Sequence, residues 1–282
     1  MGKISSFRLI GKTSAYQTKF YPNTELKNFQ HRWTPEETSL FSWFDASDKS
    51  TISLSGGVVE TILDKSPNGA SLTAESASGQ TKNQTLIPRG HNSLDVISLD
   101  GDDFYSSSPL ALSNSGNMIC FIVCNVSTIN SHVDSILSAI GATSFQLQSG
   151  HGAEFLCELQ AGPGAGVSTG KSTFGDFSGS YHIFQVVLDF TSSEALIYVD
   201  GSDITNTPIN YSTKLDINKV FRVFSNRSTA QQPSGFLAEF LIIENVDQQT
   251  RQKMEGYLAH KWGISDNLPD SNPYKFQPRY FI

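Results

Sequence analysis

The glycine-rich segment 165–172, AGVSTGKS, is the part of the chain whose residue types come nearest to a known catalytic or cofactor-binding motif. It approximates a phosphate-binding loop, with Ala165 in place of the first glycine, and it contains the G-x-S-x-G spacing of a serine nucleophile around Ser168. Both motifs need a helix directly after the loop, because that helix binds the phosphate or supports the nucleophile. Residues 173–180, TFGDFSGS, cannot sustain a helix. The sequence therefore argues against both activities and predicts a glycine-rich hairpin loop.

The candidate metal ligands are oxygen donors in two turns. The six histidines, at positions 31, 91, 132, 151, 182 and 260, show no zinc-binding spacing. A loosened EF-hand loop, with Gly69 in its turn, is matched by Asp64, Ser66, Asn68 and Glu75. Flanking helices are absent and Pro67 stiffens the loop, so an Asx-rich surface turn explains the same residues. The second acidic turn is open to the same two interpretations and comprises Asp100, Asp102 and Asp103. Calcium is the one cofactor that the sequence leaves open.

Ring-bearing side chains beside glycine- and serine-rich loops are the candidates for stacking on sugars. Glycan binding requires such ring faces together with polar groups on neighbouring loops. The residues that meet this description are Tyr105, His151, Phe174, Phe177 and Tyr181. Packing into the core is the alternative for each of them, so the sequence proposes this glycan site without selecting it.

These side chains belong to a chain whose composition favours β structure. Hydrophobic residues make up 38% of the 282 residues and charged residues 17%, so the chain can bury a core and is not disordered by composition. The net charge of -7 argues against a general nucleic-acid-binding protein. Short strand-like runs follow one another from 40–46 to 236–244, separated by turns such as Asn68-Gly69 and Asp200-Gly201.

One helix is predicted over 247–262. Asp247 can cap its N-terminus, Gly263 follows its C-terminus, and one face is apolar through Met254, Tyr257, Leu258 and Trp262. The expected fold is all-β: a two-sheet antiparallel jelly-roll sandwich with one short C-terminal helix and an N-terminal extended arm. Three cysteines, an odd number without C-x-x-C spacing, are expected to be buried thiols.

Short motifs are spread over residues 38–276. They are 41–48 (FSWFDASD), 64–69 (DKSPNG), 99–102 (LDGD), 197–201 (IYVDG) and a closing block of 237–239 (LAE), 255–263 (EGYLAHKWG), 268–269 (LP) and 272–275 (NPYK). In this order they resemble the laminin-G-like jelly-roll family of the concanavalin-A-like lectin/glucanase superfamily, of the kind found in phage and environmental bacterial proteins. Two positions depart from that pattern: Ile62 stands where the family usually has Trp, and Pro67 where it has Gly. The resemblance implies a two-sheet jelly roll used for glycan binding, adhesion or surface display.

Relatives in that superfamily also include laminarinase-like hydrolases, which place their catalytic carboxylates as Glu-x-Asp-x-x-Glu. No Glu-x-Asp occurs in this chain. Retaining glycoside hydrolysis needs two carboxylates about 5 Å apart. The chain is therefore predicted not to be an enzyme, and a glycoside hydrolase is the third-ranked function.

The ends of the chain differ from its middle. Residues 1–33 hold six basic residues and one acidic residue, net +5, whereas the remainder holds 14 basic and 26 acidic residues, net -12. Such asymmetry suggests segments with their own partners. The predicted organisation is a basic, aromatic arm over 1–33, a concanavalin-A-like jelly roll over 34–271 and a basic, aromatic tail over 272–282. The predicted partner-binding residues are Phe7, Arg8, Leu9, Tyr16, Phe20, Tyr21, Tyr274, Lys275, Arg279, Tyr280 and Phe281.

The predicted function follows from these ends. It is a non-enzymatic structural or display protein, such as a virion decoration, capsid-associated or fibre component anchored by its terminal segments. The expected partners are other subunits of a capsid or tail assembly, and neither nucleic acid nor membrane insertion is expected. No secretory signal is readable in residues 1–22, so the expected location is the virion, or the cytoplasm before assembly. The alternative function is a carbohydrate-binding, lectin-like adhesion module.

Overall fold

The computed structural model describes residues 32–112, 115–128, 134–140, 145–148, 156–159, 170–173, 178–205, 209–210, 218–226, 229, 232–278 and 281. Several residues of the predicted sites lie outside this part of the chain: Phe7, Arg8, Leu9, Tyr16, Phe20, Tyr21, His151, Phe174, Phe177, Arg279 and Tyr280.

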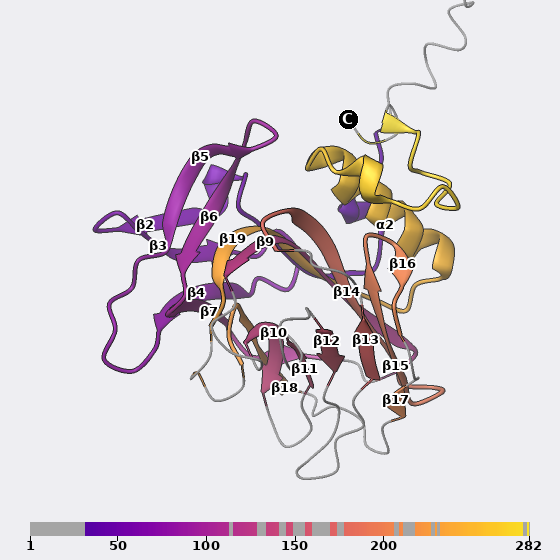
Figure 1. Cartoon of the computed structure of the whole chain (residues 1–282), viewed down its shortest axis with the longest axis horizontal. Helices are drawn as coiled ribbons and strands as arrows, with labels where there is room; N and C mark the ends of the chain where they lie inside the picture. The colour runs from indigo at the N-terminus through magenta and orange to yellow at the C-terminus, as the bar shows by residue number, and fades with distance from the viewer. Residues whose placement is uncertain are drawn as a thin grey trace, which may run out of the picture.

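Two antiparallel sheets stack face to face within the described residues (Figure 1). The nine-stranded sheet, sheet A, has the order β16-β15-β14-β9-β19-β6-β5, with β1 paired to β19 and β17 paired to β15. Its strands are β1 (Leu40–Asp45), β5 (Thr85–His91), β6 (Leu94–Asp100), β9 (Asn117–Thr128), β14 (Tyr181–Asp189), β15 (Glu194–Val199), β16 (Ser202–Asp203), β17 (Ile209–Asn210) and β19 (Ser234–Glu244).

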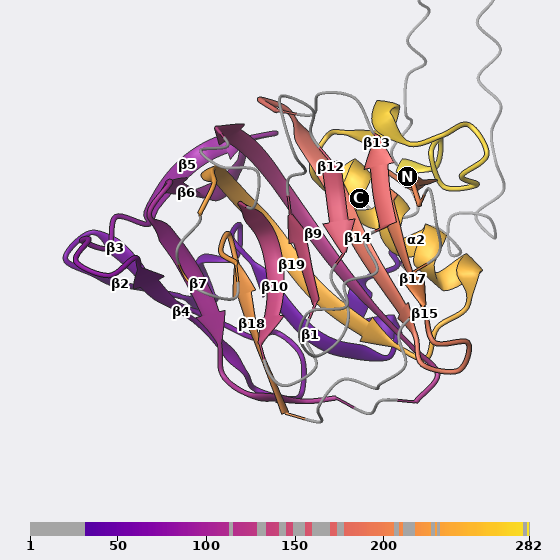
Figure 2. The same cartoon turned by 60° about the horizontal axis from the view of Figure 1, so that its bottom comes forward.

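The ten-stranded sheet, sheet B, has the order β13-β12-β11-β10-β18-β7-β4-β3-β2, with β8 paired to β18. Figure 2 shows this sheet in front of sheet A. Its strands are β2 (Ile52–Ser55), β3 (Val58–Leu63), β4 (Ser71–Ser76), β7 (Asp103–Ser107), β8 (Leu110–Ala111), β10 (Ser135–Ile140), β11 (Phe145–Gln148), β12 (Leu156–Leu159), β13 (Gly170–Thr173) and β18 (Asn218–Val223). The prediction of an all-β, two-sheet antiparallel sandwich is confirmed.

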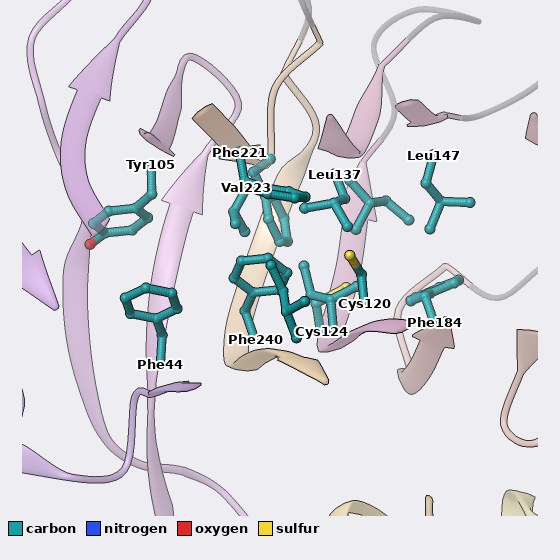
Figure 3. Close-up of a cluster of buried hydrophobic side chains, with 14 of the residues drawn as sticks. Phe44, Tyr105, Cys120, Cys124, Leu137, Leu147, Phe184, Phe221, Val223 and Phe240 are labelled. Carbon is teal, nitrogen blue, oxygen red and sulfur yellow. The ribbon is translucent and has the colours of Figure 1, made fainter. Parts of the chain in front are cut away.

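The core lies between the two sheets. Phe44 and Phe240 of sheet A face Tyr105 and Phe221 of sheet B, and the Phe44 and Phe240 rings stack with centroids 5.9 Å apart (Figure 3). Side chains of a strand point alternately to its two faces, and in β9 both faces are buried. This explains its unbroken apolar run from Met118 to Cys124, because alternate residues pack on sheet B and on the opposite layer.

Cys120 and Cys124 are buried thiols that form no disulfide among the described residues, as predicted for them. Burial raises the pKa of the Cys120 thiol, which keeps it protonated at neutral pH. These two cysteines are therefore small apolar core residues.

Helix α2 (Gln248–Lys261) covers the outer face of sheet A (Figure 1). The Asp247 side chain accepts a hydrogen bond from Thr250 N (2.8 Å), and Gly263 follows the helix at φ 68°. Both ends therefore match the predicted caps. The described residues also form three short 3₁₀ helices: η2 (Pro35–Glu37) before β1, η3 (Lys49–Thr51) between β1 and β2, and η4 (Ser265–Asn267) after α2. Among those residues, no helix has the length and apolar character needed to cross a bilayer.

Candidate functional site

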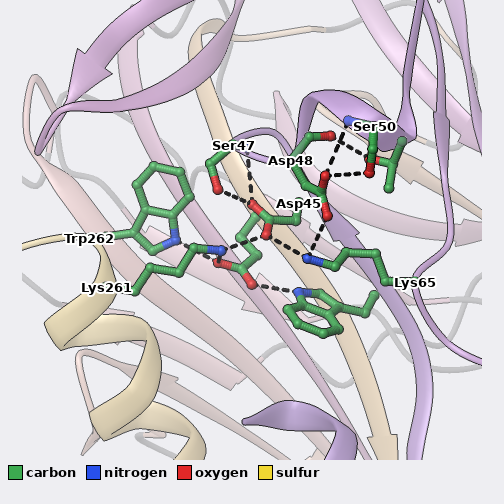
Figure 4. Close-up of polar contacts among 10 residues, drawn as sticks. Asp45, Ser47, Asp48, Ser50, Lys65, Lys261 and Trp262 are labelled. Atoms are coloured by element: carbon green, nitrogen blue, oxygen red, sulfur yellow. Dashed lines mark hydrogen bonds and ion pairs between the residues drawn. The ribbon is translucent and has the colours of Figure 1, made fainter. Parts of the chain in front are cut away.

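A buried polar network connects sheet A, helix α2 and the loop that follows β3 (Figure 4). The Asp45 carboxylate pairs with Lys261 (2.8 Å) and Lys65 (3.1 Å). Glu239, at the centre of β19, pairs with Lys261 (2.8 Å) and accepts indole hydrogen bonds from Trp43 Nε1 (2.5 Å) and Trp262 Nε1 (2.6 Å). The network therefore joins four segments that are far apart in the sequence.

The charges of this network depend on one another. Burial alone would raise the pKa of Asp45, but the ammonium groups of Lys261 and Lys65 hold it below its usual value. Burial raises the pKa of Glu239, and the charge of Lys261 opposes that effect only in part. Removing one member of such a group typically costs about 3–5 kcal/mol, because the partner charge stays buried.

The motifs that carry the family resemblance supply these residues. Trp43 and Asp45 belong to segment 41–48, Lys65 to 64–69 and Glu239 to 237–239. Lys261 and Trp262 belong to segment 255–263. All of these side chains are hydrogen-bonded or ion-paired to each other inside the protein. These side chains of the motifs therefore serve mainly to hold the two strands, the helix and the loop together.

A pocket of about 490 Å³ lies beside this network, where η2, the start of β1 and the loop after β3 meet. Lys65 belongs to both, because its ammonium group pairs with Asp45 and Asp48 (2.9 Å) while the residue lines the pocket. Its three N–H groups exceed these two acceptors by one. The pocket is lined by one carboxylate, one ammonium group, three hydroxyls and two apolar side chains: Glu36, Lys65, Thr38, Ser39, Ser66, Leu40 and Pro67.

The loop wall of the pocket is held by Asp64. Its carboxylate accepts hydrogen bonds from Trp43 N (2.8 Å), Ser66 N (2.8 Å) and Ser66 Oγ (2.7 Å). Asn68 Nδ2 donates to Phe41 O (2.7 Å), which fastens the same loop to β1. The loop is therefore an Asx-type turn closed by its own polar side chains.

The predicted EF-hand-like ligand set is not brought together. Asp64, which follows β3, donates its N–H to Ala70 O (3.1 Å) and so lies beside the residue that precedes β4, while Glu75 lies near the far end of that strand. Five residues of extended chain separate Ala70 from Glu75, a span of about 16 Å. Calcium ligands lie about 2.3–2.6 Å from the ion, so Asp64 and Glu75 cannot share one.

The second acidic turn does form a cluster. One carboxylate oxygen from each of Asp100, Asp102 and Asp103 lies within 4.8 Å of the others. Asn83 closes the turn, since its backbone N–H donates to Asp103 (3.0 Å) and its Nδ2 to Asp100 (3.1 Å). Burial and the charge of Asp100 raise the pKa of Asp103 to about 7. The closeness of the three acids therefore favours the protonated form of Asp103. Calcium binding at this turn stays a prediction.

Two of the predicted glycan-stacking rings are packed inside the molecule. Tyr105 is fully buried, and its hydroxyl donates to Val59 O (2.9 Å) in the core. Tyr181 is 8% exposed and stacks on His91 with ring centroids 3.8 Å apart. Neither ring offers a free face to a sugar, so for these two residues core packing is the correct alternative.

The tail residues that the structure describes are also packed on their own chain. Tyr274 and Phe281 are buried against helix α2, and His260 Nε2 lies 2.9 Å from Tyr274 O. Lys275 pairs with Asp270 (2.9 Å). Tyr274 and Phe281 therefore stabilise this subunit and are not available to a partner, contrary to the prediction.

The described end of the glycine-rich segment is a strand and not the start of a helix. Residues 170–173 form β13, which pairs with β12, so the last three residues of AGVSTGKS lie in a strand. The prediction that a phosphate-binding helix is missing is confirmed at these positions.

The pocket residues Glu36 and Ser39 were not predicted. No sequence signal marks them, because the pocket arises only when the loop after β3 folds over the start of β1. The capping pattern Thr34-Pro35-Glu36-Glu37 does indicate a local turn, and Glu37 Oε1 accepts from Thr34 N (3.0 Å).

No known protein-family profile matches the chain, and neither does any curated protein sequence. Solved structures do resemble it. Domain 4 of AbnA, a GH43 extracellular arabinanase from Geobacillus stearothermophilus, in complex with arabinotriose, matches with a TM-score of 0.52 and 12% identity, over 73% of this chain and 93% of that one. The binding domain of botulinum neurotoxin DC in complex with SialylT matches with a TM-score of 0.55 and 12% identity, over 78% of this chain and 51% of that one. This chain thus spans about half of the toxin domain, and the likeness concerns the β-sandwich fold.

Proposed function

We propose that this chain is a non-enzymatic glycan-binding module, and that the pocket between η2, β1 and the loop after β3 is its binding site. The observation that carries the proposal is the lining of that pocket: a carboxylate, an ammonium group and hydroxyls surround an opening of about 490 Å³. Ligand pockets typically measure about 300–1,000 Å³ and hold a few convergent polar groups among apolar ones. The composition suits a polyhydroxylated ligand with apolar C–H edges.

The pocket stands on a rigid frame. Lys65 is held by two carboxylates, Ser66 donates to Asp64, and Thr38 Oγ1 donates to Pro35 O (2.7 Å). Because these lining groups are fixed before a ligand arrives, little conformational entropy is lost on binding. Glu36 and Ser39 are exposed and complete the polar lining.

The structural neighbours support the same class of function. One is an arabinanase domain solved with arabinotriose, and the other is a toxin binding domain solved with SialylT. The toxin domain is described as a binding domain, and both structures are described as complexes, with arabinotriose and with SialylT. At 12% identity this support is limited to the fold that they share with this chain.

No reaction is proposed for the pocket. Glycoside hydrolysis uses two carboxylates on either side of the scissile bond. The pocket is lined by one, Glu36. This supports a binding role over catalysis.

The virion-display function stays a prediction with less support. It rested on partner-binding ends, and two of the described tail rings, Tyr274 and Phe281, are buried within the chain. Its remaining basis is the composition of the arm and the tail ring of Phe276, which is 73% exposed.

A glycan array with the full chain tests the proposal. We expect concentration-dependent binding to a subset of saccharides and at least a tenfold loss of affinity in Ser39→Trp, which fills the opening, and in Glu36→Gln, which removes the carboxylate. Both side chains are exposed, so the melting temperature should stay close to that of the wild type.

Two control variants match these changes elsewhere on the surface. Ser53→Trp adds the same bulk on β2, and Asp266→Asn removes an exposed acid from the short helix η4. Both should bind like the wild type. An array without hits, or equal binding by all four variants, would contradict the proposed site.

A further inference from the structure

The outward face of sheet B, opposite the core, holds a row of polar side chains that the pocket does not use. Tyr105, Val223 and Leu137 point into the core, so their sequence neighbours face outward. Thr73 is exposed and Arg222 half-buried, so this part of the face is accessible to solvent. Cross-strand pairing places the members of the row side by side in the order Thr61, Thr73, Ser106, Arg222 and Ser138.

Arg222 provides the positive charge of this row. Its guanidinium group lies over the Phe104 ring, 5.6 Å from the centroid, which fixes its position through a cation–π contact. Burial lowers the pKa of Arg222, and the negative charge of Glu75 opposes that effect only in part. Its Nη1 donates to Asn226 O (3.5 Å), and a partly desolvated guanidinium still gains strongly from a nearby anion through charge-assisted interaction.

Ser106 is the direct cross-strand neighbour of Arg222. It is only 7% exposed, and its Oγ has no hydrogen-bond partner among the residues that the structure describes. Buried hydroxyls in native proteins are nearly always hydrogen-bonded, and an unpaired one weakens the fold. A ligand oxygen held between Ser106 and Arg222 would supply the missing partner.

We propose that this face is a second binding site, which takes the carboxylate of an acidic sugar residue, a uronate, between Arg222 and Ser106. Ser138, at the end of the row, is buried and donates to Ser225 O (2.8 Å), so the groups left for a ligand are the guanidinium and the hydroxyls of Ser106, Thr73 and Thr61. They match a ligand with one planar anion and several hydroxyls of its own. Thr73, the next residue of the row, then faces the sugar hydroxyls. The inference does not depend on the pocket, which lies at the η2–β1 junction.

Calorimetric titration of the full chain with trigalacturonate tests this site. Three further titrants separate the sources of binding: the methyl-esterified trimer without charge, a neutral maltotriose, and inorganic phosphate. We expect binding of trigalacturonate alone, weakened by salt as an ionic contact should be. Arg222→Gln should weaken it by roughly ten- to a hundredfold, the range of a charge-assisted hydrogen bond.

Ser106→Ala gives the sharpest readout. Since its hydroxyl has no partner, the variant should keep or exceed the wild-type melting temperature while its affinity for trigalacturonate falls by at least fivefold. Glu75→Gln should change affinity in the opposite direction, because it removes a negative charge near Arg222. Arg89→Gln removes an exposed arginine from sheet A and should bind like the wild type.

The outcomes distinguish the two proposals. Absence of trigalacturonate binding, equal binding of the methyl ester, phosphate binding as tight as the uronate, or full affinity in Ser106→Ala would each overturn this inference. If maltotriose or an array glycan still binds through the pocket in those cases, the proposed function stands. If Arg222→Gln does not fold, Ser106→Ala and Glu75→Gln decide the question.

Discussion

Gly256 lies so close to Tyr274 that a Cβ atom on the glycine would stand 2.5 Å from the Cβ of the tyrosine. Helix propensity alone favours alanine over glycine by about 1 kcal/mol. In Gly256→Ala, however, the added methyl group must displace Tyr274 and the Phe281 ring, so we expect a net loss of about 1–3 kcal/mol in the free energy of unfolding. Urea denaturation measures this loss. Gln249→Ala, at an exposed position of the same helix, should be neutral or slightly stabilising; a stable Gly256→Ala would mean that the tail does not pack here.

Glu239→Gln should destabilise the chain by about 3–5 kcal/mol. The amide keeps one acceptor oxygen, but its NH₂ group cannot accept from Trp43 or Trp262, and Lys261 loses one of its two counter-charges. Urea denaturation at pH 7 measures the change. Glu194→Gln, a half-buried acid on β15, is the matched control and should unfold like the wild type. Equal stability of the two variants would contradict the structural role of the network.

Asp64→Ala should lower the free energy of unfolding by about 1.5–3 kcal/mol, because the turn loses a charged acceptor of several hydrogen bonds. The loss should be the same in calcium and in chelator, since Asp64 serves the loop and not an ion. Thermal melts of the wild type and the variant in both buffers test this. A wild-type melting temperature that rises in calcium only when Asp64 is present would show that the residue binds the ion.

Asp103 should make stability depend on pH in an unusual direction. Its raised pKa, about 7, means that the folded chain holds a proton that the unfolded chain releases near pH 4. Between those values the folded state binds more protons, so its contribution to the free energy of unfolding falls as pH rises. Asp103→Asn should therefore gain stability relative to the wild type between pH 4.5 and pH 7.5. Urea denaturation at the two pH values tests this, and Asp266→Asn should leave the wild-type pH dependence unchanged.

The sequence predicts the framework because local chemistry determines it. The caps of α2, Asp247 and Gly263, are readable in the sequence, and both occupy their predicted places. The run from Met118 to Cys124 predicts a strand, and it proves to be buried on both faces. Hydrophobic periodicity and helix capping depend on residues that are close in the sequence, so both can be predicted without knowledge of the tertiary structure.

The site residues depend on long-range packing and escape this kind of prediction. Phe104 and Tyr105 are adjacent aromatic residues, yet one faces outward under Arg222 and the other lies in the core. Neighbouring residues of a strand must point to opposite faces of the sheet, but the sequence does not show which of the two points into the core. Similarly, the aromatic tail packs on α2 where Gly256 leaves room for Tyr274 and Phe281. Nothing in the tail's own sequence shows this, so the sequence predicts binding to another subunit instead.

The pairing of β1 with β19 has a consequence for synthesis. The second strand emerges from the ribosome almost two hundred residues after the first, and Asp45 meets Lys261 only later still. Contacts so distant along a chain form slowly, and domains complete their folding only when the last required element is available. The nascent chain must therefore keep Leu40–Asp45 unpaired until β19 has been synthesised, so this apolar segment is open to wrong pairing, or to a chaperone, during that interval.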